Sequence, residues 1–145
     1  MLNVCSRIVV PYDNSELSKK ALDRAIILAK QNKSIELNVI TVFHVPVDVS
    51  NYGTLNIEEI RQTEYEIAKI ALNEVNKKLE ELPNRTETFV LEGIPSCTIV
   101  DFINSNNADL VVMGSRGLSN LKELFLGSVS HYVVQKVTCP VFIIK

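Results

Sequence analysis

Two short stretches decide the fold: Leu110-Val111-Val112-Met113-Gly114-Ser115-Arg116-Gly117 and, after nine further residues, Gly127-Ser128-Val129-Ser130. The first is an apolar run that ends in glycine, which is typical of a buried strand followed by a tight turn. The second is a glycine followed by hydroxyl-bearing residues, where a helix can begin. Backbone N–H groups at such a loop and helix start can bind an anion. The two stretches therefore predict a site for the phosphate chain of a nucleotide.

The length and composition predict one globular domain that spans residues 1–145. A chain of 145 residues has the usual size of a domain with a single core, and its composition, 46% hydrophobic and 22% charged, can fill that core. Lysine and arginine together number 15, against 17 aspartates and glutamates. Because a nucleic-acid-binding protein needs positive charge to neutralise phosphates, this balance argues against a DNA or RNA partner.

The chain carries no signal for export, membrane insertion or metal binding. No apolar run is long enough to cross a bilayer, and the N-terminal residues do not resemble a signal peptide, so we expect a cytoplasmic protein. The cysteines, Cys5, Cys97 and Cys139, are odd in number and far apart, which predicts buried or part-buried thiols without a disulfide or zinc site. His44 and His131 are isolated and lack the spacing of a metal-binding pair.

Strand-like and helix-like segments alternate along the chain. Apolar and β-branched runs predict five strands, and amphipathic segments between them predict helices. The longest helix has Asn56 at its cap and an apolar stripe that includes Ile60, Ile67 and Val75. This alternation requires right-handed crossovers and a mainly parallel sheet covered on both faces, so we predict a single-domain Rossmann-like α/β fold. The predicted strands are 7–11, 35–43, 86–91, 109–113 and 141–144.

Ligands of such sheets bind beyond the carboxyl ends of the strands, where the winding direction reverses. The loops that follow the strands are therefore the candidates for a site: residues 11–15, 44–54, 93–95 and 114 onward. The glycine-rich stretch is one of these loops. Topology and motif consequently indicate the same edge of the sheet.

The glycine pattern resembles the ATP-binding branch of the universal stress protein family, which carries G-x-x-G, nine residues, then G followed by Ser or Thr. The resemblance covers the whole chain, from Val9-Val10-Pro11 with Asp13 to Cys139-Pro140-Val141. It implies an adenine nucleotide α-hydrolase-like fold with five parallel strands in the order 3-2-1-4-5, and a bound adenine nucleotide, ATP or else ADP or AMP. Mg²⁺ would be held mainly by phosphates and water. The resemblance also implies a homodimer.

The resemblance assigns site residues by position. Asp13 is placed near the adenosine and Val45 beside the adenine, with Pro11 and Met113 completing the walls. The residues alone leave a structural alternative open for each: Asp13 as a helix cap, Val45 and Met113 as core residues, and the glycines as turns. Contacts to ribose and phosphate are assigned to Gly114, Arg116, Gly117, Gly127, Ser128, Val129 and Ser130.

The chemistry of these residues agrees with that assignment. Gly127 has no Cβ, so phosphate oxygens can approach the backbone there. Ser128, Val129 and Ser130 offer N–H groups at a helix start, and the two serines add hydroxyl donors. Arg116 reaches a phosphate or lies in solvent. The predicted cradle thus binds a triphosphate without a lysine.

The sequence favours binding over catalysis. It contains no Walker lysine, no G-x-S-x-G elbow and no histidine beside a nucleophile, and the resemblance implies slow ATP hydrolysis at most. We therefore expect a nucleotide-dependent switch or sensor in a stress response, acting on a protein partner that the sequence does not identify.

Two other functions are compatible with parts of the pattern. A dimeric interaction module that uses no nucleotide would pair through Val141-Phe142-Ile143-Ile144, because a final strand lies at the sheet edge, unless the preceding helix covers it. A response regulator would use Asp13 in a phosphorylation pocket. A response regulator also needs a phosphoacceptor aspartate after the third strand and a lysine after the fifth. Here the acid nearest the end of the third strand is Glu92, and the fifth strand ends the sequence, so that function is weakly supported.

Overall fold

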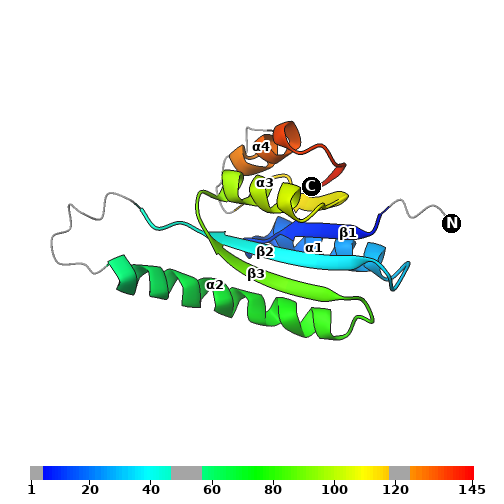
Figure 1. The fold of residues 1–145 in the computed structure, drawn as a ribbon, viewed down its shortest axis with the longest axis horizontal. Helices are drawn as coiled ribbons and strands as arrows, with labels where there is room; N and C mark the ends of the chain where they lie inside the picture. Colours follow the sequence, from blue (N-terminus) through cyan, green and yellow to red (C-terminus); the bar gives the residue numbers. More distant parts are fainter. Residues whose placement is uncertain (1–4, 47–56, 118–124) are drawn as a thin grey trace.

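In a computed structural model, which describes residues 5–46, 57–117 and 125–145, the chain forms a five-stranded parallel sheet with helices on both faces (Figure 1). The strand order is β3-β2-β1-β4-β5, so the predicted fold class and strand order are confirmed. The elements are β1 Arg7–Pro11, α1 Glu16–Ala29, β2 Glu36–Phe43, α2 Ile57–Glu80, β3 Thr86–Glu92, α3 Pro95–Ser105, β4 Leu110–Gly114, α4 Ser128–Lys136 and β5 Val141–Ile144.

The order of the strands fixes where a ligand can bind. From β1 the chain winds to β2 and β3 on one side, and then returns to the other side of β1 for β4 and β5. β1 and β4 pair directly, with Val9 opposite Val111. Because the loops after these two strands leave in opposite directions, the carboxyl ends of β1 and β4 border a natural crevice.

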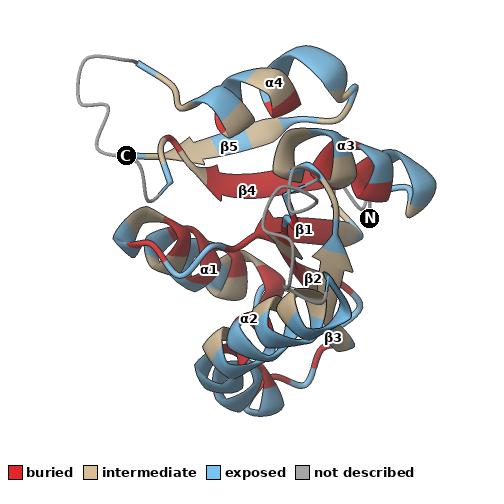
Figure 2. Cartoon of the chain, turned by 90° about the vertical axis from the view of Figure 1, so that its left-hand side faces the viewer, coloured by how far each residue is buried: buried red, intermediate tan, exposed pale blue. Residues whose placement is uncertain are grey.

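The two faces of the sheet have separate cores, as the buried segments in Figure 2 indicate. Ile8 and Val10 of β1 pack with α1 and α2, whereas Val9 and Val111 pack with α3 and α4. Side chains alternate between the faces along a strand, so a strand covered on both sides must be apolar at every position. This explains the unbroken apolar runs in β1 and β4.

The long helix α2 buries only part of the predicted stripe: Val75 is buried as predicted and Ile60 is part-buried, but Ile67 is not buried. Ile67 is 57% exposed, so its assignment to the buried face is wrong. One residue along a helix is a rotation of about 100°, and the small Ala68 takes the position against the sheet that the larger isoleucine was expected to fill. The predicted cap, Asn56, lies outside the described residues. The buried residues of α2 are Ala68, Leu72, Val75 and Leu79.

The cysteines match the prediction in part. Cys5 and Cys139 are part-buried, as predicted, but Cys97, on α3, is exposed, contrary to expectation. Within the described ranges there is no cluster of metal-binding side chains. The described helices also include none with the length and apolar character needed to span a membrane.

Candidate functional site

A pocket opens at the carboxyl ends of β1 and β4, where the strand order reverses. It is walled by the β1–α1 turn, the end of β4 with its loop, the start of α4 and parts of β2 and α3. Every predicted site residue except Val45 lines it, namely Pro11, Asp13, Met113, Gly114, Arg116, Gly117, Gly127, Ser128, Val129 and Ser130.

The start of α4 presents unpaired backbone donors. Gly127 is the N-cap residue, with φ −67° and ψ 166°, and no side chain caps the helix. The first bond of α4 runs from the N–H of His131 to the carbonyl of Gly127, at 2.9 Å. The N–H groups of residues 128–130 consequently have no acceptor among the described residues. Together with the helix dipole, they form a site that favours an anion.

Ser115 fastens this helix start to the sheet. Its carbonyl accepts from the N–H of Gly127 and from the hydroxyl of Ser130, each at 2.7 Å, and its own N–H donates to Ile144 at the end of β5, at 2.8 Å. The Ser130 hydroxyl therefore donates its proton to a backbone carbonyl in this structure. Donation from this hydroxyl to a phosphate would require that bond to break and stays a prediction, whereas Ser128 is exposed.

Gly114 and Gly127 serve different purposes. A Cβ on Gly114 would lie 2.7 Å from Cβ of Leu17, so this glycine lets β4 pack against α1. A Cβ on Gly127 would lie 3.4 Å or more from its neighbours, which is ordinary van der Waals distance. Because the φ angle of Gly127 is also ordinary, the fold does not require a glycine there. The absence of a side chain at Gly127 leaves open the space beside the backbone N–H groups at the start of α4.

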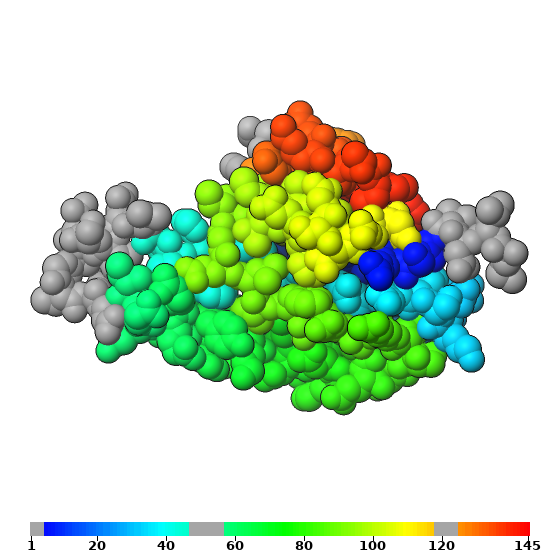
Figure 3. All heavy atoms as spheres, viewed as in Figure 1, coloured from blue at the N-terminus to red at the C-terminus, as the bar shows by residue number. Residues whose placement is uncertain are grey.

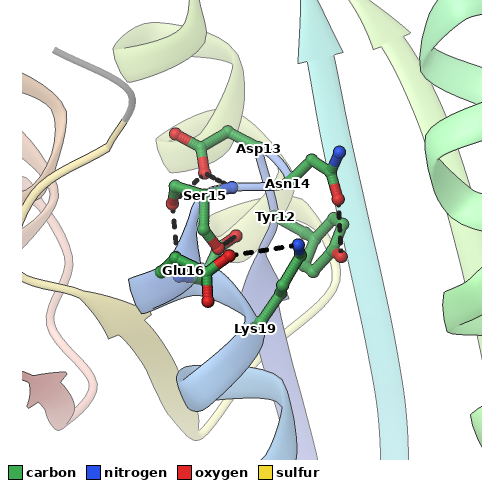
Figure 4. Close-up of polar contacts among 7 residues, drawn as sticks. Tyr12, Asp13, Asn14, Ser15, Glu16 and Lys19 are labelled. Atoms are coloured by element: carbon green, nitrogen blue, oxygen red, sulfur yellow. Dashed lines mark hydrogen bonds and ion pairs between the residues drawn. The ribbon is translucent and has the colours of Figure 1, made fainter.

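Asp13 does not cap α1. The N-cap is Ser15, whose Oγ accepts from the N–H of Ser18 at 3.2 Å. The Asp13 carboxylate instead accepts from the N–H and the hydroxyl of Ser15, which closes the turn seen in Figure 4. Burial, together with the nearby Asp13 carboxylate, raises the pKa of Tyr12 above its usual value, so its phenol stays neutral and donates to Asn14. Asp13 therefore closes the turn and lines the pocket, but it is not the N-cap of α1.

The opposite wall is apolar and was largely missed from the sequence. It consists of Ile40 and Val42 of β2 with Pro95 and Ile99 of α3. The rule that ligands bind at the carboxyl ends of strands indicated the 93–95 loop, but not the side chains that point inward from β2. Val45, expected beside the adenine, lies in a buried cluster with other side chains near α2 and does not line the pocket. Apolar character alone does not distinguish a pocket wall from a core.

The sequence model of the universal stress protein family matches residues 5–145. The chain belongs to this family. One relative, universal stress protein MJ0531 of Methanocaldococcus jannaschii, is 35% identical over 99% of this chain and 84% of its own length. The solved structure of MJ0577 has a TM-score of 0.87 and 27% identity, covering 98% of this chain and 96% of that one. A universal stress protein solved in complex with cAMP has a TM-score of 0.72 at 24% identity, over 99% of both chains, a likeness that shows the shared fold.

Proposed function

We propose that this universal stress protein binds ATP in the pocket between β1 and β4 and acts as a nucleotide-dependent switch or sensor in a stress response. The observation that carries the proposal is the start of α4, where three backbone N–H groups without a described acceptor face a pocket that Gly127 leaves open. Anions bind where such donors converge at a helix N-terminus. Arg116, on the same side of the pocket, adds a positive charge for a phosphate.

The rest of the pocket suits a nucleoside. Asp13 offers a hydrogen-bond acceptor, and the apolar wall from β2 and α3 suits the faces of a base. The cAMP-bound family member shows that this fold can hold an adenine nucleotide in that protein. ADP and AMP would fit the same cradle with fewer phosphate contacts, so we expect ATP to bind most tightly.

The lining residues favour holding ATP over hydrolysing it. Among the described residues of the pocket, Asp13 is the only carboxylate, and no lysine or histidine accompanies it. Mg²⁺ would thus be held by the phosphates and water, and any hydrolysis would lack a dedicated base close to the phosphates. A switch of this kind would signal through the difference between its nucleotide-bound and free states.

Calorimetric titration tests the proposal. ATP, ADP, AMP and cAMP are each titrated with Mg²⁺ into the wild type, and the melting temperature is followed in parallel, since a ligand that binds the folded state raises it. We expect saturable binding in the order ATP, ADP, AMP. No heat and no rise in melting temperature at millimolar ATP would refute it.

A second function, pairing through β5, is supported by the sheet edge. β5 is a terminal strand of the sheet, and Phe142 on it is 48% exposed. Exposed apolar edge strands pair readily, so a homodimer through residues 141–144 would hide this side chain and could work without a nucleotide. Phe142→Glu should shift the protein to monomer in sedimentation analysis. A dimer that survives this change would show that β5 is not the contact.

A further inference from the structure

The Asp13 carboxylate is held in one orientation by the turn between β1 and α1. Its Oδ1 accepts from the backbone N–H of Ser15, at 3.0 Å, and from the Ser15 hydroxyl. Ser15 is itself fixed, because it is only 8% exposed and its Oγ also accepts the N–H of Ser18. In Figure 4 the other carboxylate oxygen of Asp13 points away from Ser15.

Gly117 makes room for that second oxygen. A Cβ at Gly117 would lie 2.5 Å from Oδ2 of Asp13, which is too close for both to keep their places. Among the described glycines only Gly93 has a positive φ, so the backbone does not demand a glycine at 117. What Gly117 supplies is space for the carboxylate. No described residue donates a hydrogen bond to Oδ2, and both Asp13 and Gly117 line the pocket.

We propose that Ser15 and Gly117 are positioning residues that keep Oδ2 of Asp13 open to the pocket, where it accepts a hydrogen bond from the nucleotide and makes binding selective for ligands with that donor. This inference rests on the proposed function above. An ionised carboxylate accepts hydrogen bonds only, so the matching group is a neutral O–H or N–H. An adenine nucleotide has two sources of such a donor, the ribose hydroxyls and the 6-amino group.

The same geometry orients the ligand. Asp13 repels phosphate, whereas the N-terminus of α4 and Arg116 attract it. A nucleotide therefore enters with its donor end toward Asp13 and its anionic end toward α4. Ser15 and Gly117 would act on the first contact, because neither adds a charge, the phosphate-binding N–H groups belong to α4, and an alanine Cβ at 117, although next to Arg116, meets Asp13 alone.

The experiment measures the Kd of four ligands by calorimetry: ATP, 2′-deoxy-ATP, 3′-deoxy-ATP and purine riboside triphosphate, which lacks the 6-amino group. The wild type should bind at least one of the three analogues roughly tenfold more weakly than ATP, the loss expected for one hydrogen bond to a charged acceptor. The analogue affected identifies the donor. Ser15→Ala and Gly117→Ala should each weaken ATP to the level of that analogue while leaving the Kd of the analogue itself unchanged. Ser15→Thr, which keeps the hydroxyl, should restore the selectivity.

The two variants check each other. Ser15→Ala also removes the cap of α1, whereas Gly117→Ala keeps the cap and meets only the terminal carboxylate of Asp13, with no backbone atom in its way, so its melting temperature should stay near that of the wild type. If these residues were merely structural, ATP and its analogues would weaken equally, and that outcome would overturn the inference. So would a wild type that binds all four ligands equally. A wild type that binds none of them would overturn the proposed function as well, which separates the two failures.

Discussion

Gly127 offers the sharpest test of whether the motif glycines serve the ligand or the fold. An alanine Cβ at this position would meet Cα of Arg116 at 3.4 Å and the carbonyl oxygen of Ser115 at 3.5 Å, without a clash. Glycine is a better N-cap than alanine by roughly 0.5–1 kcal/mol. Alanine recovers about 0.4–1 kcal/mol by restricting the unfolded chain. These effects nearly cancel, so Gly127→Ala should change the free energy of unfolding by less than about 1 kcal/mol.

Binding should respond differently from stability. The larger Gly127→Val side chain extends beyond the Cβ position into the space beside the α4 donors, where a phosphate must lie. Losing one hydrogen bond to a charged group costs about 1.5–3 kcal/mol, which corresponds to roughly a tenfold to hundredfold rise in the Kd of ATP. Calorimetric titration gives the Kd, and thermal unfolding of the same samples gives the stability.

Gly114 provides the matched control. A Cβ there would lie 2.7 Å from Cβ and 3.1 Å from the carbonyl carbon of Leu17. Overpacking of this kind typically costs 1–3 kcal/mol, so Gly114→Ala should lower the melting temperature clearly. The reasoning is refuted if Gly127→Val binds ATP as tightly as the wild type, or if Gly127→Ala destabilises the protein as much as Gly114→Ala does.

Three further predictions concern the core and the titratable groups. Leu22→Ala, at a side chain 1% exposed, should cost about 2–5 kcal/mol in urea unfolding, whereas Ile67→Ala, at 57% exposed, should cost under about 0.5 kcal/mol. Burial raises the pKa of Asp109, but hydrogen bonds from neighbouring hydroxyl, backbone and thiol donors outweigh it and lower the pKa overall. The resulting stabilisation is present at neutral pH and is lost as the pH falls through the lowered pKa, so acid should destabilise the wild type more than Asp109→Asn; equal pH profiles would contradict this. Burial, with the Asp109 carboxylate nearby, raises the pKa of Cys5 to about 12, so at pH 8 this thiol should react with a disulfide reagent far more slowly than the exposed Cys97, and equal rates would disprove it.

The sequence was sufficient for the fold because the signals that define it are local and repeated. The unbroken apolar runs of β1 and β4 predict strands buried on both faces, and alternation with helices leaves few topologies. Ile67 shows where this reasoning fails. Helical spacing of apolar residues placed Ile67 on the buried stripe, but the structure buries the neighbouring Ala68 and leaves Ile67 exposed, because spacing alone does not fix the rotation of a helix against the sheet.

The site was predictable where chemistry is tied to the backbone. Gly127 and the residues after it were located by their pattern, since a helix start needs no particular side chain to offer its N–H groups. Contacts that cross between elements were not predictable. The Ser130 hydroxyl donates a hydrogen bond to the carbonyl of Ser115, fifteen positions earlier in the chain. Val45 packs in a cluster with Ala68 of α2 instead of lining the pocket. Both outcomes depend on tertiary packing that no local pattern encodes.

The most direct test of the central claim is to follow the backbone amides of Ser128, Val129 and Ser130 by ¹⁵N NMR while ATP is added. If the start of α4 holds the phosphates, these amides should show the largest shifts, saturating with the Kd found by calorimetry. Adenosine, which lacks phosphates, should move them much less. Saturable ATP binding that leaves the three amides unmoved would contradict the account and place the nucleotide elsewhere.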